Sequence, residues 1–403
     1  MAGNTYRQLL RSREFCALWV GNALGVASTT MAGLTLATIV YAQTGSAFLT
    51  AVAMFGPSTV QLVGALTLMS AADTARPRIV LVIAAVCMAG AHALQAAFDL
   101  DAVARVLVLL GASYVLSIGS GTRWGLLSQV LARDAYALGR SAMNLSVGVM
   151  QVVGFAAGGA LVLILDPRAI LWIGAGLAAL AIPVAWFGIG DRPARRSGRV
   201  GIRETWQGHR ALWQLTSVRP LVVALCVPNG LIAGCEALFV PYAGSGAGPL
   251  FVAAALGMLA GDVVVGRLLP SWARRRVGVW LSLGLAVPFL IFVSRPGVPV
   301  AAGLVAIASV GFAATLAQQE LLVELTPPAM VGQVLGADSA LRVTAQGLAA
   351  VLAGVLAEVL GAAAAITVLA AASVTVSGIL FPALRRLTRP AQDHRPDLIT
   401  SRA

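Results

Sequence analysis

The sequence predicts an all-α membrane protein with twelve transmembrane helices in two pseudo-symmetric six-helix bundles. Of the 403 residues, 59% are hydrophobic and only 11% are charged, whereas soluble domains carry about 25% charged residues. A helix that crosses a bilayer needs roughly 20 mainly apolar residues, so twelve helices need about 240. The hydrophobic residues of this chain are enough for that number, and the composition excludes an ordinary soluble enzyme.

Apolar runs bounded by Arg, Asp, Pro and Gly mark the expected spans. In the first half they are 15–41, 47–71, 79–98, 102–122, 141–164 and 169–189. In the second half they are 220–243, 248–269, 277–294, 298–319, 332–357 and 361–383. The fourth and tenth runs have the least distinct ends.

The arginines predict the orientation, because short cytoplasmic loops collect positive charge. With the N-terminus inside, only Arg105, Arg168 and Arg295 fall in the external connections. We therefore expect a multi-pass protein of the cell inner (plasma) membrane with both termini in the cytoplasm.

The longest connection is polar and basic, and it divides the chain into parts. We expect an N-terminal six-helix bundle at 1–190, a basic cytoplasmic central loop at 191–218, a C-terminal six-helix bundle at 219–384 and a cytoplasmic tail at 385–403. An offset of 193 residues relates several glycines of the two halves, among them Gly64 to Gly257 and Gly154 to Gly347. Such internal similarity favours a duplicated transporter fold with a site between the halves.

Residues 64–78 read GALTLMSAADTARPR and connect the second and third spans. Together with six plus six helices and a basic central loop, this segment resembles the loop signature of the major facilitator superfamily. Asp73, Arg76 and Arg78 match that signature, although Ala71 and Ala72 stand where the family has a glycine. The resemblance implies a cytoplasmic gate, and the alternative is a solvated turn that follows the positive-inside rule.

Two further motifs indicate a branch of that superfamily. Residues 154–159 read GFAAGG, similar to the antiporter signature GPxxGG, with Phe155 in place of the proline. Residues 326–334 read TPPAMVGQV, similar to a loop of macrolide-efflux-like and siderophore-exporter members, with Gln333 where those have arginine. The resemblance implies a drug:proton antiporter, although the small residues of GFAAGG also suit plain helix packing.

Charged residues inside the spans are candidates for proton coupling, because a charge in hydrocarbon is costly. All the candidates lie in the second half: Glu236, Asp262, Asp338 and Arg342. Asp338 and Arg342 are four residues apart, so we expect them to face the same side of a helix as an ion pair. Structural charge neutralisation is the alternative for this pair.

Glu236 is the preferred coupling residue because it has no basic partner three or four positions away. A carboxyl group surrounded by apolar side chains favours its protonated form, which would link proton uptake to transport. The alternative places Glu236 near the outer interface in contact with water. For Asp262, five residues before Arg267, a part in gate structure is favoured over substrate binding.

The resemblance also implies that helices 1, 4, 7 and 10 line a central cavity. The polar residues that these spans offer as substrate contacts are Asn22, Thr29, Tyr114, Ser117, Asn229, Thr315 and Gln318. Small polar groups among Leu, Val and Phe suit a small lipophilic or amphipathic organic molecule. Arg123, at the inner end of the fourth span, is either an attractor of anionic groups or an interfacial anchor.

The expected function is proton-coupled export of small lipophilic or amphipathic organic molecules by alternating access. The alternatives are an importer or facilitator of a small nutrient and, from another class, a membrane sensor or enzyme on the same fold. The dispersed His and Cys residues form no metal or catalytic motif, so we expect no enzyme activity, no cofactor and no metal. The expected partners are a small-molecule substrate, protons and the bilayer, without nucleic acid, for a monomeric protein.

Overall fold

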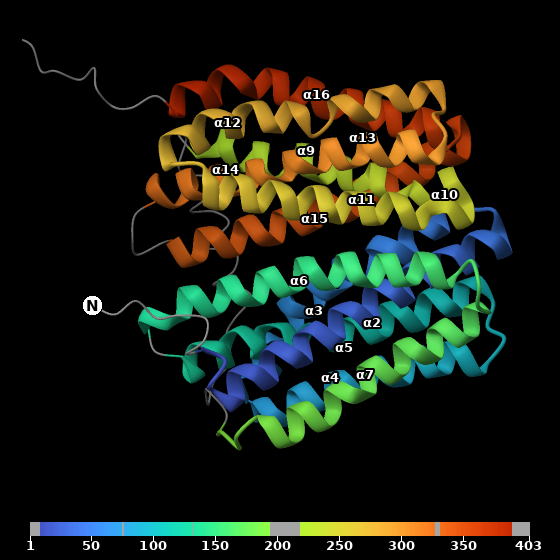
Figure 1. Ribbon diagram of the computed structural model, residues 1–403, viewed down its shortest axis with the longest axis vertical. Coiled ribbons are helices and arrows are strands. Elements are labelled where there is room, and N and C mark those ends of the chain that lie inside the picture. Colours follow the sequence, from blue (N-terminus) through green and yellow to red (C-terminus); the bar gives the residue numbers. More distant parts are fainter. Residues whose placement is uncertain (1–8, 75, 132, 194–217, 327–330, 389–403) are drawn as a thin grey trace, which may run out of the picture.

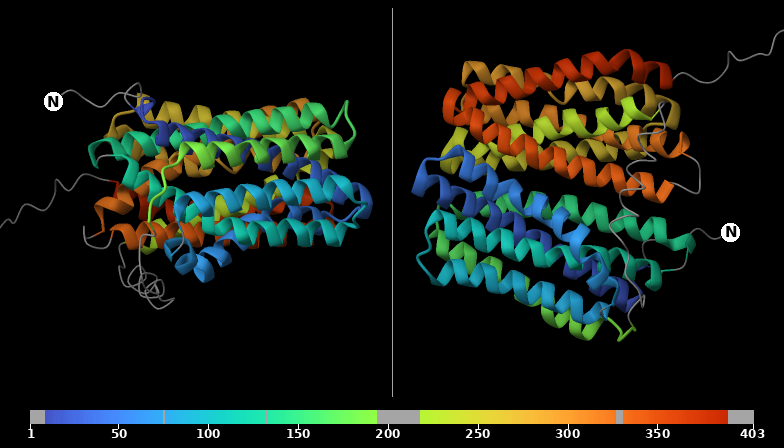
Figure 2. Two further views of the ribbon diagram at one scale, coloured as in Figure 1. Left: turned by 90° about the horizontal axis from the view of Figure 1, so that it is seen from below. Right: turned by 180° about the vertical axis from the view of Figure 1, so that it is seen from behind.

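The computed structural model describes residues 9–74, 76–131, 133–193, 218–326 and 331–388, and these are almost entirely helical (Figures 1 and 2). The helices of the first half are α2 (Arg13–Thr44), α3 (Ala47–Thr74), α4 (Pro77–Ala97), α5 (Ala102–Val130), α6 (Arg133–Leu161) and α7 (Pro167–Gly188). Each of the six predicted spans of this half coincides with one of these helices.

The helices of the second half are more often interrupted. They are α9 (Arg219–Ala237), α10 (Phe239–Ala243), α11 (Ala247–Val263), α12 (Ser271–Gly284), α13 (Val298–Val310), α14 (Ala314–Glu324), α15 (Val331–Leu360) and α16 (Ala362–Leu387). A π-helical turn follows α11 at Val264–Leu268, and 3₁₀ segments follow α12 at Val287–Ser294 and α13 at Gly311–Ala313. Pro288, which lacks an N–H group, lies at the start of the first of these 3₁₀ segments and accounts for that break.

The described residues contain eleven segments long and apolar enough to cross a membrane. One of them, Arg219–Leu268, is 50 residues long and is divided by a turn at Gly244, whose φ is 57°. Its two parts, α9 and α11, each have the length of a crossing, which gives the twelve spans that the sequence predicts. The chain is an all-α, multi-pass membrane protein.

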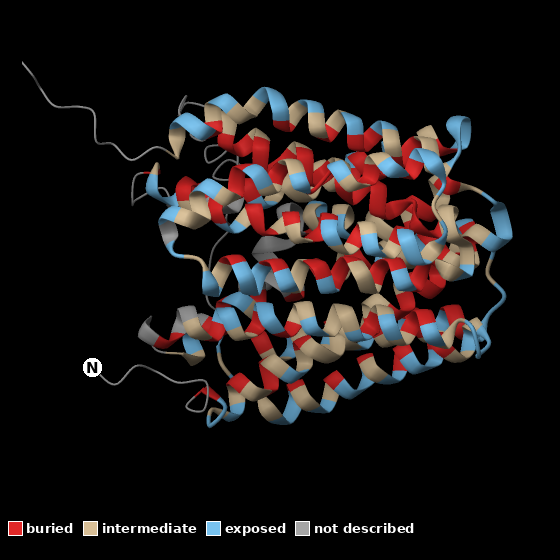
Figure 3. Ribbon diagram, turned by 45° about the horizontal axis from the view of Figure 1, so that its top comes forward, coloured by how far each residue is buried: buried red, intermediate tan, exposed pale blue. Residues whose placement is uncertain are grey.

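The surface of the molecule agrees with a lipid environment. Figure 3 shows exposed residues along the outward faces of the helices, and many of these are large and apolar, such as Leu107, Phe187 and Ile307. In water such faces would be unfavourable, whereas lipid tails solvate them. Burial of the backbone polar groups within helices satisfies their hydrogen bonds without water.

Figure 1 shows α2 to α7 on one side of the molecule and α9 to α16 on the other. We refer to these helix groups as the first and second halves. The turn at Gly45 lies at one end of the helices, here called the Gly45 end, and Arg76 lies at the opposite end, called the Arg76 end. Most of the predicted central loop and tail, residues 194–217 and 389–403, falls outside the described residues.

Equivalent glycines make equivalent helix contacts in the two halves. A Cβ atom on Gly64 of α3 would lie 2.8 Å from the backbone oxygen of Tyr114 on α5. A Cβ atom on Gly257 of α11, 193 residues later, would lie 2.3 Å from the oxygen of Ala306 on α13. The same pair of helices in each half therefore packs through a glycine, as expected for a duplicated fold.

The two halves pack against each other at the Gly45 end. The largest hydrophobic cluster mixes residues of both halves, for example Leu34 and Ala37 with Phe239. Clusters at the Arg76 end belong to one half each, around Phe15 in the first half and Leu221 in the second. The described contacts thus close the interface at the Gly45 end.

Candidate functional site

A cavity of about 310 Å³ lies between the two halves, and we call it the central cavity. Helices α2 to α6 line it from the first half, and α9 and α11 line it from the second. Its wall includes both apolar and polar side chains: Thr29, Met54, Ser58, Gln61, Met88, His92, Ser113, Gln151, Phe155, Glu236, Phe251 and Met258. Its volume is at the lower end of the roughly 300–1,000 Å³ that ligand pockets occupy.

Glu236 is the carboxylic acid among the described residues that line the central cavity. Its residue surface is 8% exposed, and its buried Oε1 atom has no hydrogen-bond partner among the described residues. A buried carboxylate without a partner is unstable in its ionised form. This group therefore needs a proton or a polar partner, and it lines a cavity between the two halves.

Two phenyl rings form an aromatic contact across the central cavity. The ring of Phe155 on α6 stacks on that of Phe251 on α11, with centroids 4.9 Å apart and an interplanar angle of 20°. Phe155 occupies the position where the antiporter signature has proline. The departure from the signature thus supplies an apolar contact between the halves at the cavity wall.

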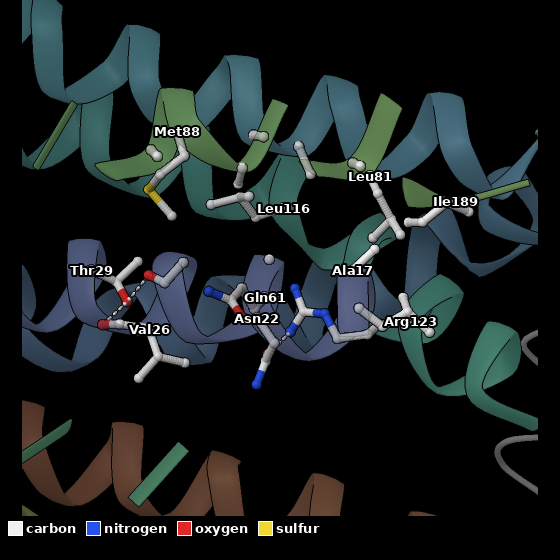
Figure 4. Close-up of a pocket in the computed structure, with 18 residues that line it drawn as sticks. Ala17, Asn22, Val26, Thr29, Gln61, Leu81, Met88, Leu116, Arg123 and Ile189 are labelled. Carbon is white, nitrogen blue, oxygen red and sulfur yellow. Dashed lines mark hydrogen bonds between the residues drawn. The ribbon is translucent and has the colours of Figure 1, made fainter. Parts of the chain in front are cut away.

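A second cavity, of about 230 Å³, lies within the first half among α2, α3, α4, α5 and α7 (Figure 4). We call it the first-half cavity. Thr29, Gln61 and Met88 line both cavities, so the two spaces adjoin at these residues. A ligand in one cavity would contact side chains that also belong to the other.

Arg123 and Asn22 provide the polar groups at one part of the first-half cavity. Arg123 Nη1 donates a hydrogen bond to Asn22 Oδ1 over 2.5 Å, which joins α5 to α2 (Figure 4). Among the described residues, no carboxylate forms an ion pair with Arg123. The cavity is otherwise lined mainly by Ala, Gly, Leu and Met side chains.

The predicted substrate contacts are not brought together in one place. Asn22 and Thr29 line the first-half cavity, and Thr29 also lines the central cavity. The remaining predicted contacts are absent from the walls of both cavities: Tyr114, Ser117, Asn229, Thr315 and Gln318.

Some of these polar side chains form contacts between helices instead. Asn229 Oδ1 accepts a bond from Gln346 Nε2 at 2.7 Å, joining α9 to α15. Gln318 Nε2 donates to Ser282 Oγ at 2.8 Å, joining α14 to α12. Such bonds satisfy polar groups inside the bilayer and explain these residues without a ligand.

The expected ion pair between Asp338 and Arg342 does not form, and that expectation was wrong. Asp338 is fully buried, and its Oδ2 accepts a hydrogen bond from Gln319 Nε2 at 3.3 Å. Arg342 is only partly buried and forms no ion pair with a described carboxylate. The Asp338 side chain is instead held against α14 by its bond to Gln319.

Asp262 is exposed near the end of α11 and lines neither cavity. Val263 separates it from the π-helical turn that contains Arg267. The structure therefore leaves Asp262 apart from Glu236 and from both cavities.

The predicted gate residues lie at the Arg76 end. Arg76 Nη1 is 2.9 Å from Asp191 Oδ2, and Arg78 Nη2 is 3.8 Å from the same oxygen. The guanidinium of Arg78 also lies over the ring of Trp186, 4.8 Å from its centroid. Arg76 thus contacts the segment that follows α7, and Arg78 contacts both that segment and α7 itself. The side chain of Asp73 lies outside the described residues.

Sequence reasoning missed the amide residues Gln61 and Gln151, which line the central cavity from α3 and α6. The resemblance directed attention to helices 1, 4, 7 and 10, and neither of these residues belongs to that set. The signal in the sequence is that each residue is the one glutamine of its predicted span.

No family model matches the chain, and no curated protein matches it. Solved structures do match. A POT family transporter in complex with 5-aminolevulinic acid superposes with a TM-score of 0.68 at 14% identity, covering 94% of this chain and 97% of that one. The nucleoside transporter NupG gives a TM-score of 0.68 at 13% identity, covering 93% of this chain and 100% of the other.

A bacterial homologue of the human lysosomal transporter Spinster, in an inward-facing and unoccupied conformation, gives a TM-score of 0.67 at 14% identity. The superposition covers 94% of this chain and 97% of that homologue. These superpositions show that this chain has the fold of these transporters, the major facilitator fold. At such identities the likeness establishes the fold alone.

Proposed function

We propose that this chain is a secondary active transporter that exports small lipophilic or amphipathic organic molecules in exchange for protons. The observation that carries the proposal is the unpartnered carboxyl group of Glu236 in the cavity between the halves. The fold supports a mechanism in which the two halves rock around a central site.

Proton coupling follows from the chemistry of Glu236. An ionised carboxylate in this cavity lacks a described partner, so it gains stability either by binding a proton or by contacting a polar group of a substrate. When a proton or a substrate group is bound at Glu236, binding of the other stabilises the carboxyl group less. Their alternation links the movement of substrate to the movement of protons.

The direction of export rests on the sequence motifs. The halves are packed together at the Gly45 end, and the positive-inside rule predicts that the Arg76 end faces the cytoplasm. The central cavity is then accessible from the cytoplasmic side in this state, which importers and exporters share. The resemblance of residues 154–159 and 326–334 to motifs of drug exporters favours export.

The lining of the central cavity favours a lipophilic substrate. Phe155, Phe251, Met88 and Met258 contribute aromatic rings and flexible thioethers, which adapt to irregular apolar ligands. Uptake or facilitated passage of a small nutrient is the second candidate, because the similar structures include peptide and nucleoside transporters. A sensor or enzyme that keeps the fold without transport is the third.

The proposal is tested with the full chain in proteoliposomes under an imposed pH gradient. The probes are ethidium, erythromycin and octanoate, which represent cationic, macrolide and anionic lipophilic compounds. Movement of at least one probe in the direction opposite to proton flow supports exchange. Movement with the protons supports uptake, and no movement of any probe under either gradient would overturn the export of lipophilic molecules.

The coupling residue is tested with Glu236→Gln, which removes the charge and keeps the shape. We expect this variant to lose gradient-driven transport and to keep passive exchange of the same probe. The matched control is Glu320→Gln, whose carboxyl group lies 3.3 Å from Arg274 Nε outside the central cavity. Wild-type pH dependence in Glu236→Gln would remove the residue from the mechanism.

A further inference from the structure

Arg123 carries more hydrogen-bonding capacity than the described protein uses. A guanidinium offers five N–H donors, and the described bond of Arg123 is the one to Asn22 Oδ1. The guanidinium lies in the wall of the first-half cavity beside Asn22 and Gln61 (Figure 4). Its remaining donors and its positive charge are therefore available to a molecule in that cavity.

The position of Arg123 differs from that of an interfacial anchor. An anchoring arginine lies at the end of a helix, where its side chain reaches the lipid head groups. Arg123 is about two helical turns before Val130, the last residue of α5. Its side chain bonds across to α2 instead of extending beyond the helix end.

The rest of the first-half cavity is a narrow apolar space. Small residues leave this space open on several helices: Gly21 and Gly25 on α2, Ala84 and Ala85 on α4, and Ala178 and Ala181 on α7. No acidic residue lines it among the described positions. An apolar chain with a single anionic group matches this arrangement, because the chain fits the apolar wall and the anion fits the guanidinium.

The two cavities divide the charges between them. Arg123 belongs to the first-half cavity and Glu236 to the central cavity, and Thr29, Gln61 and Met88 connect the two spaces. An anionic group would be repelled by an ionised Glu236 and attracted by Arg123. A ligand with its anion at Arg123 can therefore extend its apolar part toward the central cavity.

We propose that the first-half cavity binds the acidic head of an amphipathic organic anion, with Arg123 and Asn22 as its polar contacts. The statement that such anions are the transported substrates rests on the proposed function. The binding step itself is independent of transport and is tested separately. A carboxylate is the simplest head group, and the phosphate of an anionic lipid has the same chemistry.

Binding is tested by calorimetry on the full chain in phosphatidylcholine nanodiscs. The probes are octanoate, octanol and octyltrimethylammonium, which share the chain length and differ in charge. We expect octanoate to bind at least about tenfold more tightly than octanol, as a charge-assisted bond implies. Equal affinity for the three probes, or preference for the cation, would overturn the proposal.

Variants assign the preference to this cavity. Arg123→Gln should reduce the octanoate preference to about unity, and Arg123→Lys should retain part of it because the charge remains. The matched control is Arg140→Gln, which removes an exposed arginine that contacts the ring of Trp124 and lines neither cavity. If Arg123→Gln does not fold, Arg123→Lys decides instead, since an unchanged octanoate preference in Arg123→Lys would contradict recognition by the guanidinium of Arg123.

A change of lipid distinguishes the source of the anion. In phosphatidylglycerol nanodiscs, weaker octanoate binding by the wild type but not by Arg123→Gln would assign the site to a lipid head group. Equal effects on both proteins would assign it to the free carboxylate. Octanoate binding without transport in proteoliposomes would retain the site and contradict the proposed function, so the two failures are separable.

Discussion

Glu236 and Asp338 are buried acids of the second half in different surroundings. Glu236 lines the central cavity and leaves one oxygen without a described partner. Asp338 is fully buried and lines neither cavity; its Oδ2 accepts a bond from Gln319, and its Oδ1 also lacks a described partner. The difference in surroundings favours coupling at Glu236 and packing at Asp338.

The first prediction concerns Asp338→Asn. The amide keeps an oxygen that accepts from Gln319 and removes the cost of a buried charge, so we expect an unchanged or higher melting temperature. Asp338→Ala should lower it, because an unpaired buried amide costs about 1–3 kcal/mol. Thermal unfolding of both variants in detergent checks this, and equal losses for the two would show that the negative charge itself is required.

The second prediction concerns Asp99, in the loop between α4 and α5. A hydrogen bond from Arg168, and then the charge of Arg168, hold the pKa of Asp99 below its usual range. A carboxyl group whose pKa is lowered by folding stabilises the protein above its unfolded pKa, and this stabilisation is lost as the pH falls through the folded pKa. Asp99→Asn should therefore melt slightly lower than wild type at neutral pH.

The difference in melting temperature should begin to shrink below about pH 4, where the carboxyl group of the unfolded chain takes up a proton, and should disappear once the pH falls below the lowered pKa of the folded protein. Melting curves between pH 3 and pH 7 check the expectation. Arg168→Gln should show the same reduced pH dependence as Asp99→Asn. A difference between Asp99→Asn and wild type that stays constant with pH would indicate that the pair does not act through charge.

The crossing of α6 and α11 brings the halves together through two glycines. A Cβ atom on Gly159 would lie 2.7 Å from the Cα of Gly248, so the two backbones meet directly. Gly154, in the same GFAAGG segment, faces Thr30 on α2. These glycines serve close helix packing, as the alternative interpretation of the motif predicted, and nearby Phe155 adds a ring contact across the same interface.

The third prediction compares Gly159→Ala with Gly176→Ala. The first adds a methyl group at the backbone contact and should cost about 1–3 kcal/mol by overpacking. The second is the matched control, because Gly176 on α7 has nothing within 4 Å of its added Cβ and should gain from the helix propensity of alanine. Thermal unfolding checks both, and equal effects would show that this crossing tolerates wider spacing.

Hydrophobic run length predicted the helices well because the bilayer requires it. The expected span 298–319 in fact continues to Glu324, since Glu320 and Glu324 contact Arg274 and Arg275 of α12. The interruptions after α11 and α13 were not predictable, because they arise from packing between helices. For the same reason the sequence identified Glu236 as an unpaired acid but did not place Gln61 and Gln151 beside it.

On the scale of the whole molecule, the closure at the Gly45 end uses a helix cap that spans the two halves. Glu358 near the end of α15 accepts a hydrogen bond from Ser46 Oγ at 2.7 Å and from the backbone N–H of Phe48 at 3.1 Å. A carboxylate favours the N-terminus of a helix, here α3. This contact exists only while the halves are together at this end, so it biases the equilibrium between the two transport states.

The fourth prediction is that Glu358→Ala increases opening at the Gly45 end. A lost N-terminal cap costs about 0.5–1 kcal/mol, which corresponds to a roughly twofold to fivefold larger open population. The reporter is Ala51→Cys in a background without native cysteines, because Ala51 is fully buried and contacts Ala237 and Ala350 across the interface. Its reaction rate with a membrane-impermeant maleimide measures the opening.

Asp101→Ala provides the control for this experiment. Asp101 also caps a helix at the Gly45 end, accepting a hydrogen bond from Ala104 N at 2.7 Å, but donor and acceptor both belong to the first half. Loss of this cap should destabilise α5 locally. It should leave the labelling of Ala51→Cys unchanged, because the Asp101 cap is present in both the closed and the open state. Equal acceleration by Glu358→Ala and Asp101→Ala would mean that local fraying exposes the reporter, and the closure would then depend on apolar packing alone.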